Sequence, residues 1–135
     1  MSQENVEALR RAFEASASEG YDLSPFFALY SPDVELYVSP SAAESGVWRG
    51  FDAVTKWWLD IVATWDRVSW EPREFIDIGD GVLDVVDLYA WNRQSDVALR
   101  QQVAHVFRFS EDEIVRVEYY FAGKQEALEA AGLSE

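Results

Sequence analysis

The stretch QQVAHVFRF (residues 101–109) contains the only histidine of the chain. His105 stands among valine and phenylalanine residues, in a segment that otherwise has the composition of a β-strand. A histidine in an apolar strand is either packed in the core or placed in a pocket, where it can transfer a proton or hold an oxyanion. His105 is therefore the first candidate for chemistry, and the elements around it decide between the two interpretations.

Alternation along the strands assigns the residues to faces of a sheet. In the His105 strand, the apolar-rich face consists of Gln101, Val103, His105, Phe107 and Phe109, which predicts that His105 faces inward. In the last strand, the inward face is predicted to be Val115, Val117, Tyr119 and Phe121. The strand before His105 is ambiguous because both of its faces carry apolar residues. One face is Leu83, Val85, Asp87, Tyr89 and Trp91, and the other is Val82, Asp84, Val86, Leu88 and Ala90.

Composition excludes several classes of function. A formal charge of −14 argues against binding to nucleic acid or to anionic membranes. The chain has no cysteine and one histidine, so we expect neither a metal site nor another cofactor. The N-terminal segment lacks the apolar run of a signal peptide, and no stretch approaches the roughly 20 apolar residues of a membrane span. We therefore expect a cytoplasmic protein.

The pattern of elements predicts one α+β domain over residues 1–135. Helices are expected at 3–19 (ended by Gly20), 22–30, 51–65 and 124–131, with strands at 33–38, 68–78, 82–93, 97–110 and 113–121. Residues 39–50 are expected to form a loop of small residues. The predicted architecture is a curved antiparallel sheet of four to six strands, wrapped by three to four helices and enclosing a pocket. The sheet is apolar on both sides and the helices suffice for only one, which predicts a homodimer through its back.

In order and spacing, several stretches resemble the SnoaL-like domains of the nuclear transport factor 2-like superfamily. They are NVEALRRAFEA, YSPDVEL, GVWRG with the aromatic helix after it, EFIDIGDGV, AHVFRF and EALEAAGL, and they span nearly the whole chain. The resemblance implies a cone-shaped fold whose members include polyketide cyclases, ketosteroid isomerases and epoxide hydrolases. One fold hosts many functions, so the reaction must be tested at individual positions.

The catalytic patterns of these enzymes are not reproduced. At the isomerase base this sequence has Ser39 or Val38, at the helix tyrosine it has Phe13, and at the late-strand acid it has His105. The inward positions of the last strand lack the carboxylate expected for a cyclase, and Ala122 stands where many SnoaL-like domains have aspartate. No inward Asp-Arg-Asp cluster of an epoxide hydrolase is found in the sequence.

The resemblance implies that the face with Asp87, Tyr89 and Trp91 lines the pocket. If the hairpin turns near Gln94–Ser95, Asp87 would lie opposite about Val103 and diagonal to His105. An Asp87–His105 pair could act as an acid/base unit, or it could be purely structural. The candidate ligand-binding residues are Trp48, Trp57, Tyr89, Trp91, Gln101, Tyr119 and Glu35, with Trp58 and Trp65 as further candidate walls.

Three functions stay open at this point. The first is a cofactor-free enzyme that isomerises, cyclises or hydrates a hydrophobic ring-containing molecule, with His105 as acid/base or oxyanion donor. The second is a non-catalytic ligand-binding or accessory protein of the same fold. The third is a dimerisation domain, whose cone would be filled.

Overall fold

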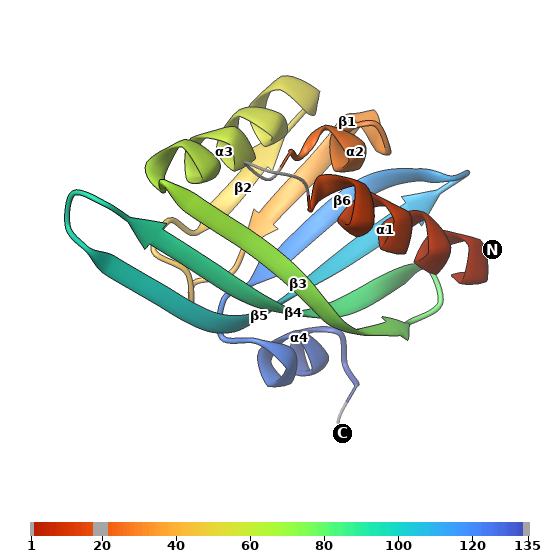
Figure 1. Cartoon of the computed structure of the whole chain (residues 1–135). Helices are drawn as coiled ribbons and strands as arrows, with labels where there is room; N and C mark the ends of the chain where they lie inside the picture. The colour runs from red at the N-terminus through yellow and green to blue at the C-terminus, as the bar shows by residue number, and fades with distance from the viewer. Residues whose placement is uncertain (1, 18–21, 134–135) are drawn as a thin grey trace.

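A six-stranded curved sheet forms the centre of the molecule, in the strand order β2-β1-β6-β5-β4-β3 (Figure 1). The computed structural model describes residues 2–17 and 22–133. The strands are β1 (Tyr30–Val38), β2 (Gly46–Arg49), β3 (Arg67–Asp77), β4 (Gly81–Asn92), β5 (Val97–Ser110) and β6 (Glu113–Tyr120). The helices are α1 (Ser2–Ser16), α2 (Ser24–Phe27), α3 (Phe51–Thr64) and α4 (Lys124–Ala130). The predicted α+β class is therefore confirmed.

The inner face of the sheet is covered by α1, α2 and α3, and α4 lies on the opposite side (Figure 1). Helix α3 follows the predicted amphipathic pattern, since Val54, Trp57 and Trp58 are buried. These residues join one core with Leu9 and Phe13 of α1 and with inner-face residues of the strands. The helices and the sheet together form a cone whose core combines aliphatic side chains with many aromatic rings.

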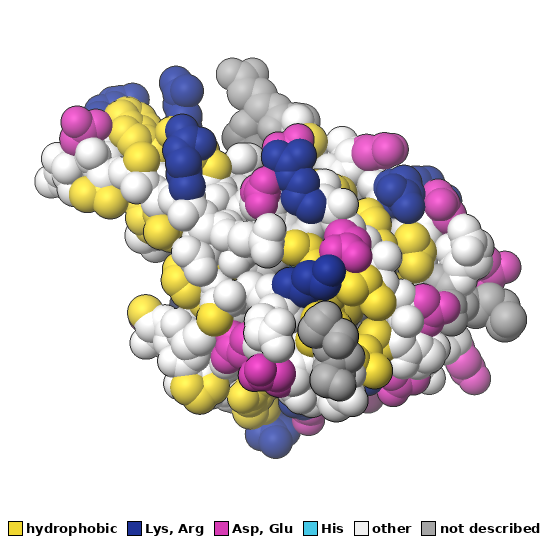
Figure 2. All heavy atoms as spheres, turned by 90° about the horizontal axis from the view of Figure 1, so that it is seen from below, with side chains coloured by type: hydrophobic (Ala, Val, Ile, Leu, Met, Phe, Trp, Pro, Cys, Tyr) yellow, Lys and Arg dark blue, Asp and Glu magenta, His cyan; other side chains and the backbone are white. Residues whose placement is uncertain are grey.

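The outer face of the sheet is partly covered by α4, contrary to the expectation that helices cover one face only. Ala127 and Leu128 of α4 form a second buried cluster with Leu83, Val85 and Val106 of the central strands. This second layer explains why β4 is apolar on both faces. Figure 2 shows this side of the molecule, where hydrophobic side chains form separate patches between charged ones.

Several predicted boundaries and pairings differ from the structure. Residues 46–49 form β2 in a segment expected to be a loop, and α2 is shorter than the expected helix at 22–30. The pairing of β1 with β6 is parallel, whereas all other neighbouring strands are antiparallel as expected. An irregularity between Arg108 and Phe109 shifts the β5–β6 register, so that Ile114 rather than Val115 lies in the inner core. The predicted helix end at Gly20 lies outside the described residues.

Candidate functional site

A buried Asp–His pair lies at the centre of the inner face. Asp84 of β4 pairs with His105 of β5 in the antiparallel register, so the two side chains emerge side by side on the same face. Asp84 Oδ1 accepts a hydrogen bond from the backbone N–H of His105 at 2.7 Å and lies 2.9 Å from its Nδ1. Asp84 is fully buried and His105 is 4% exposed. The aspartate therefore orients the imidazole ring.

This contact leaves two polar atoms of the pair without a partner. An acceptor at Nδ1 favours the tautomer with its proton on Nδ1, which leaves a lone pair on Nε2. His105 Nε2 makes no hydrogen bond with any residue that the structure describes, and buried Asp84 Oδ2 likewise has none. Such groups cost stability when buried, so a ligand or water is the natural partner for Nε2.

Aromatic rings enclose the histidine. The Tyr119 ring is stacked on the imidazole at a centroid distance of 5.3 Å, while Phe107 lies at 5.7 Å and Trp58 at 5.8 Å. His105 also lines a cavity of about 30 Å³. The other residues that line this cavity are Phe13, Leu23, Phe26, Phe27, Tyr30, Trp58, Trp70 and Phe107. A space of this volume holds about one water molecule and no ring-containing ligand.

Two residues that line the same cavity, Trp58 and Tyr30, carry hydrogen-bond donors for which the described part of the chain shows no acceptor. The indole Nε1 of Trp58 is buried and makes no hydrogen bond, and no bond from the Tyr30 hydroxyl to a described residue is found. Burial raises the pKa of Tyr30 well above its ordinary value, and it raises the pKa of Tyr119 in the same way. Both phenols therefore stay protonated at neutral pH and can serve as neutral donors.

The residues predicted to bind a ligand divide between the two faces of the sheet. On the inner side, Trp57 packs against both Trp48 and Tyr119, with centroid distances of 5.7 and 6.0 Å. The side chain of Gln101 donates to the carbonyl oxygen of Phe121 at 3.0 Å. Of these four predicted residues, Tyr119 is the one in ring contact with His105, and none of the four lines the small cavity.

The predicted placement of Asp87 is wrong. Asp87 pairs with Gln102, which puts its side chain on the outer face, where it forms an ion pair with Arg73 at 2.5 Å. Because β4 alternates, Tyr89 and Trp91 lie on that outer face as well. Their rings are covered by arginine side chains, Tyr89 by Arg100 at 4.6 Å and Trp91 by Arg67 at 5.8 Å.

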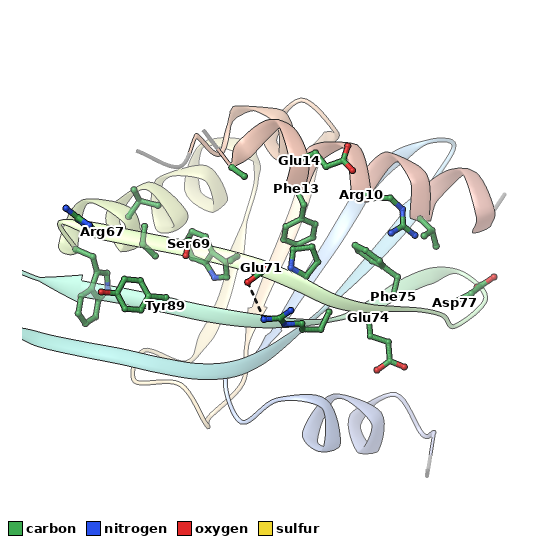
Figure 3. Close-up of a pocket in the computed structure, with 18 of the residues that line it drawn as sticks. Arg10, Phe13, Glu14, Arg67, Ser69, Glu71, Glu74, Phe75, Asp77 and Tyr89 are labelled. Carbon is green, nitrogen blue, oxygen red and sulfur yellow. Dashed lines mark hydrogen bonds and ion pairs between the residues drawn. The ribbon is translucent and has the colours of Figure 1, made fainter. Parts of the chain in front are cut away.

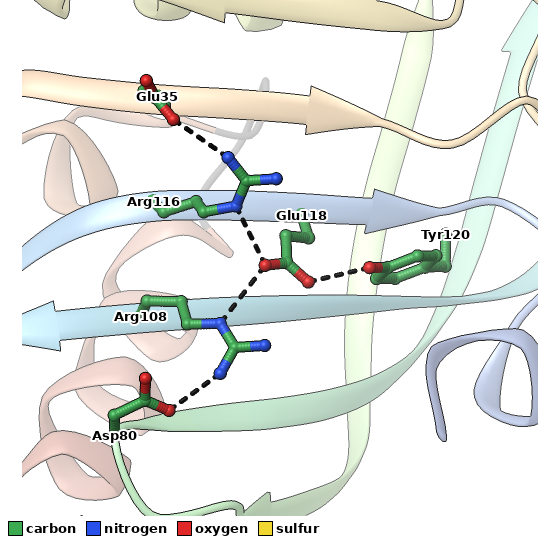
Figure 4. Close-up of polar contacts among 6 residues, drawn as sticks. All are labelled: Glu35, Asp80, Arg108, Arg116, Glu118 and Tyr120. Carbon is green, nitrogen blue, oxygen red and sulfur yellow. Dashed lines mark hydrogen bonds and ion pairs between the residues drawn. The ribbon is translucent and has the colours of Figure 1, made fainter. Parts of the chain in front are cut away.

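Glu35 also lies on the outer face, at one end of a chain of ion pairs (Figure 4). It binds Arg116 at 2.9 Å and the exposed Arg49 at 3.0 Å. Arg116 and Arg108 share the carboxylate of Glu118, at 3.0 and 3.2 Å. Arg108 continues to Asp80, and the Tyr120 hydroxyl donates to Glu118 at 2.7 Å. Each carboxylate of this network is paired, so the network is a structural element of the sheet.

Sequence reasoning missed Asp84 and Tyr30 and did not single out Trp70. A signal for Asp84 was available, since strict pairing about a turn centred on Gln94–Ser95 sets residue 84 opposite residue 105. The expected register of Asp87 with Val103 is one residue out, and a shift of one residue moves a side chain to the other face.

The cone of one curved sheet and its covering helices is consistent with the NTF2-like fold. The chain belongs to the family of SnoaL-like domains, whose model matches residues 7–117. A comparison with curated proteins finds no match.

Solved structures with little sequence identity share the fold. An NTF2-like protein of unknown function from Burkholderia pseudomallei K96243 is 22% identical, with a TM-score of 0.73 over 87% of this chain and 89% of that chain. A candidate SnoaL-like polyketide cyclase from Jannaschia sp. CCS1 is 13% identical, with a TM-score of 0.76 over 96% and 92%. TerC, co-crystallised with polyporic acid, is 18% identical, with a TM-score of 0.71 over 94% and 96%.

Within residues 2–17 and 22–133, no group of three or more His, Asp or Glu side chains is arranged to hold a metal ion. Over the same ranges, no helix has both the length and the apolar character required to cross a bilayer.

Proposed function

We propose that the protein binds a hydrophobic, ring-containing small molecule inside the cone and that His105 transfers a proton on it without a cofactor. The observation that carries this proposal is the Asp84–His105 pair, which binds the ring at Nδ1 and leaves Nε2 unpaired in a side chain that lines an aromatic cavity. The reaction class is isomerisation, cyclisation or hydration next to a carbonyl group.

Asp84 and His105 together contain the groups that general acid–base catalysis requires. Nε2 takes a proton from a carbon or oxygen of the ligand, and the resulting imidazolium is stabilised by the carboxylate of Asp84. The same nitrogen then returns the proton at another position, so no net proton is consumed. Negative charge that develops on the ligand oxygen needs donors, and we assign this role to the buried Trp58 Nε1–H, with the Tyr30 hydroxyl as a second donor.

Two structural neighbours support the class of ligand. TerC was crystallised with polyporic acid, and another neighbour carries a polyketide-cyclase name. Their identity to this chain is below 25%, so they support a choice of first ligands rather than a reaction.

A non-catalytic ligand-binding or accessory role is the second candidate. Val38, Ser39 and Phe13 stand where the resemblance to isomerases implies catalytic groups, and the Ser39 hydroxyl is bonded to Glu126 on the outer side. The cavity of about 30 Å³ also has to enlarge before any ring can enter. Both observations favour binding without turnover.

Deuterium exchange separates the two functions without knowledge of the natural reaction. In heavy water, the wild type should accelerate exchange at the carbon next to the carbonyl of 2-tetralone, by about a hundred- to ten-thousandfold if a positioned base acts. His105→Gln should abolish the acceleration while keeping affinity, and Asp87→Asn on the outer face is the matched control. Binding of 2-tetralone or polyporic acid to the wild type, seen as shifts of the His105 NMR signals, without accelerated exchange would support the accessory role. No shift with either ligand would overturn both.

We further propose that the protein forms a homodimer through the back of the sheet and that it is located in the cytoplasm. The part of the back that α4 leaves uncovered carries Tyr89 and Trp91 with their arginine partners, and such residues are common at protein interfaces. Light scattering of the purified protein, compared with Trp91→Ala, tests the dimer.

A further inference from the structure

A second, much larger space lies next to the cavity at His105. A groove of about 1510 Å³ follows the edge strand β3. Part of it lies between α1 and the inner face of β3, where Arg10 and Phe13 point toward Phe75 (Figure 3). Tyr89 and Glu74 line the part on the other side of the strand (Figure 3). The lining of the groove combines apolar and charged side chains, and on the α1 side the Arg10 guanidinium lies 5.0 Å above the Phe75 ring.

The groove and the small cavity share two lining residues, Phe13 and Trp70. Both are deeply buried, with 5% and 7% of their surface exposed. Phe13 comes from α1 and Trp70 from β3, so the two elements that flank the groove each contribute one shared residue. These two rings form the wall between the groove and the histidine.

Ring contacts lead from this wall to His105 along two paths. Phe13 contacts Phe75 in the groove at 5.9 Å and Phe26 in the cavity at 4.8 Å. Phe26 is stacked on Phe107 at 6.3 Å, and Phe107 contacts His105 at 5.7 Å. On the other path, Trp70 contacts Trp58 at 6.3 Å, and Trp58 contacts His105 at 5.8 Å.

The inner end of these paths lacks hydrogen-bond partners. Trp58 is 7% exposed and lines the cavity, and its indole N–H makes no hydrogen bond within residues 2–17 and 22–133. His105 Nε2 has none either among the residues with described positions. A donor and an acceptor behind the rings of Phe13 and Trp70 match a ligand that is apolar where it meets these rings and carries an oxygen at its leading edge.

We propose that the groove between α1 and β3 binds the body of a flat, apolar ring compound, and that Phe13 and Trp70 determine whether its oxygen-bearing edge reaches His105. The proposal rests on the proposed function for the identity of the inner site. The groove would be the binding site for the rest of the ligand, and Phe13 and Trp70 would determine which ligands enter. Displacement of either ring would connect the two spaces, whereas a larger ring at position 13 would keep them apart.

Chemical labelling of the single histidine tests this passage without any turnover. Diethyl pyrocarbonate reacts with an accessible imidazole nitrogen, and the modified His105 is quantified by mass spectrometry. Phe13→Ala should be labelled on the order of tenfold faster than the wild type, because local opening limits the rate. Leu9→Ala is the matched control, since Leu9 lies in the same helix as Phe13, is fully buried and lines neither the groove nor the cavity. Its rate should stay close to that of the wild type.

Further variants keep the test decisive if Phe13→Ala does not fold. Phe13→Leu should accelerate labelling to a smaller extent, Trp70→Phe should accelerate it, and Phe13→Trp should slow it. In Phe13→Leu, 2-tetralone should protect His105. Equal acceleration by Leu9→Ala, or fast labelling of the wild type that position 13 does not change, would overturn the proposal. The expected labelling pattern without deuterium exchange would leave the passage standing and remove only the catalytic role.

Discussion

Replacing the histidine of the buried pair tests whether Asp84 and His105 contribute to stability or to function. In His105→Phe, the new ring fits the aromatic surroundings, but the Asp84 carboxylate loses its partner at 2.9 Å. It stays fully buried, with one hydrogen bond from the backbone N–H at 2.7 Å. Removing one member of a buried pair costs about 3–5 kcal/mol of the free energy of unfolding. For a chain of 135 residues, each kcal/mol lowers the melting midpoint by roughly 3–4 °C, so the expected decrease is about 10–20 °C.

The double variant Asp84→Val/His105→Phe should be more stable than His105→Phe. Asp84→Val alone leaves two donors of His105 buried without an acceptor, at about 1–3 kcal/mol each. The double variant removes the carboxylate and the imidazole together and leaves one backbone N–H unpaired, so its expected loss is about 1–3 kcal/mol. The sum of the two single losses should therefore exceed the double loss by about 3 kcal/mol or more, which is the coupling energy of the pair.

Urea unfolding of the four proteins at one pH measures this cycle. The double variant should fold but fail to accelerate exchange in 2-tetralone, which would assign the pair to function. Additive losses would show that the two side chains do not interact. A loss below about 1 kcal/mol in His105→Phe would show that Asp84 is not held in a dry interior. Either result would refute the reasoning.

Three further predictions concern other titratable groups. Burial raises the pKa of Tyr119, so the contribution of its neutral hydroxyl to stability is present below the unfolded pKa of about 10 and is lost as the pH rises above it. Above this pH, the free energy of unfolding of Tyr119→Phe should fall by about 1.4 kcal/mol less per pH unit than that of the wild type, as measured by urea unfolding. Glu118→Gln should cost about 1–3 kcal/mol because two half-buried arginines lose a shared carboxylate, whereas Arg49→Gln in an exposed ion pair should cost under about 0.5 kcal/mol. Asp84→Asn should change the tautomer of the single histidine, as observed in the NMR shifts of its ring nitrogens, and Asp87→Asn should not.

Most elements could be predicted because local chemistry determines them. The turns at Asp80 and Gln94–Ser95 separate long alternating strands, and the aromatic helix has a clear apolar face. Strand β2 (Gly46–Arg49) was missed, since a four-residue strand among small residues gains its stability from pairing with β1 rather than from its own sequence. The inward position of His105 followed from alternation and is confirmed.

The face of β4 could not be chosen from its composition. Both faces are apolar because the cone buries Val82 and Val86 while α4 and its neighbours bury Leu83 and Val85. Periodicity carries no signal in a strand that is buried on both sides, and only the register from the hairpin turn could decide. The size of the cavity is a separate matter, because it depends on how the rings of several elements pack together in three dimensions.

The arrangement of unpaired polar groups is the strongest indication that the centre of the cone is more than a core. Trp57 Nε1, Trp58 Nε1 and Asp84 Oδ2 are buried without a hydrogen bond to any residue whose position the structure describes, and Trp58 and Asp84 both contact His105. Each such atom costs about 1–3 kcal/mol, in proteins whose total stability is about 5–15 kcal/mol. A cone that served only for dimerisation would be more stable with leucine and phenylalanine at these positions, since the surrounding rings already exclude water. The cost at Trp58 is understandable if its indole N–H binds a ligand that enters past Phe13 and Trp70, because Trp58 lines the cavity and its hydrogen bond is then completed in the bound state. Asp84 is then retained because it orients His105.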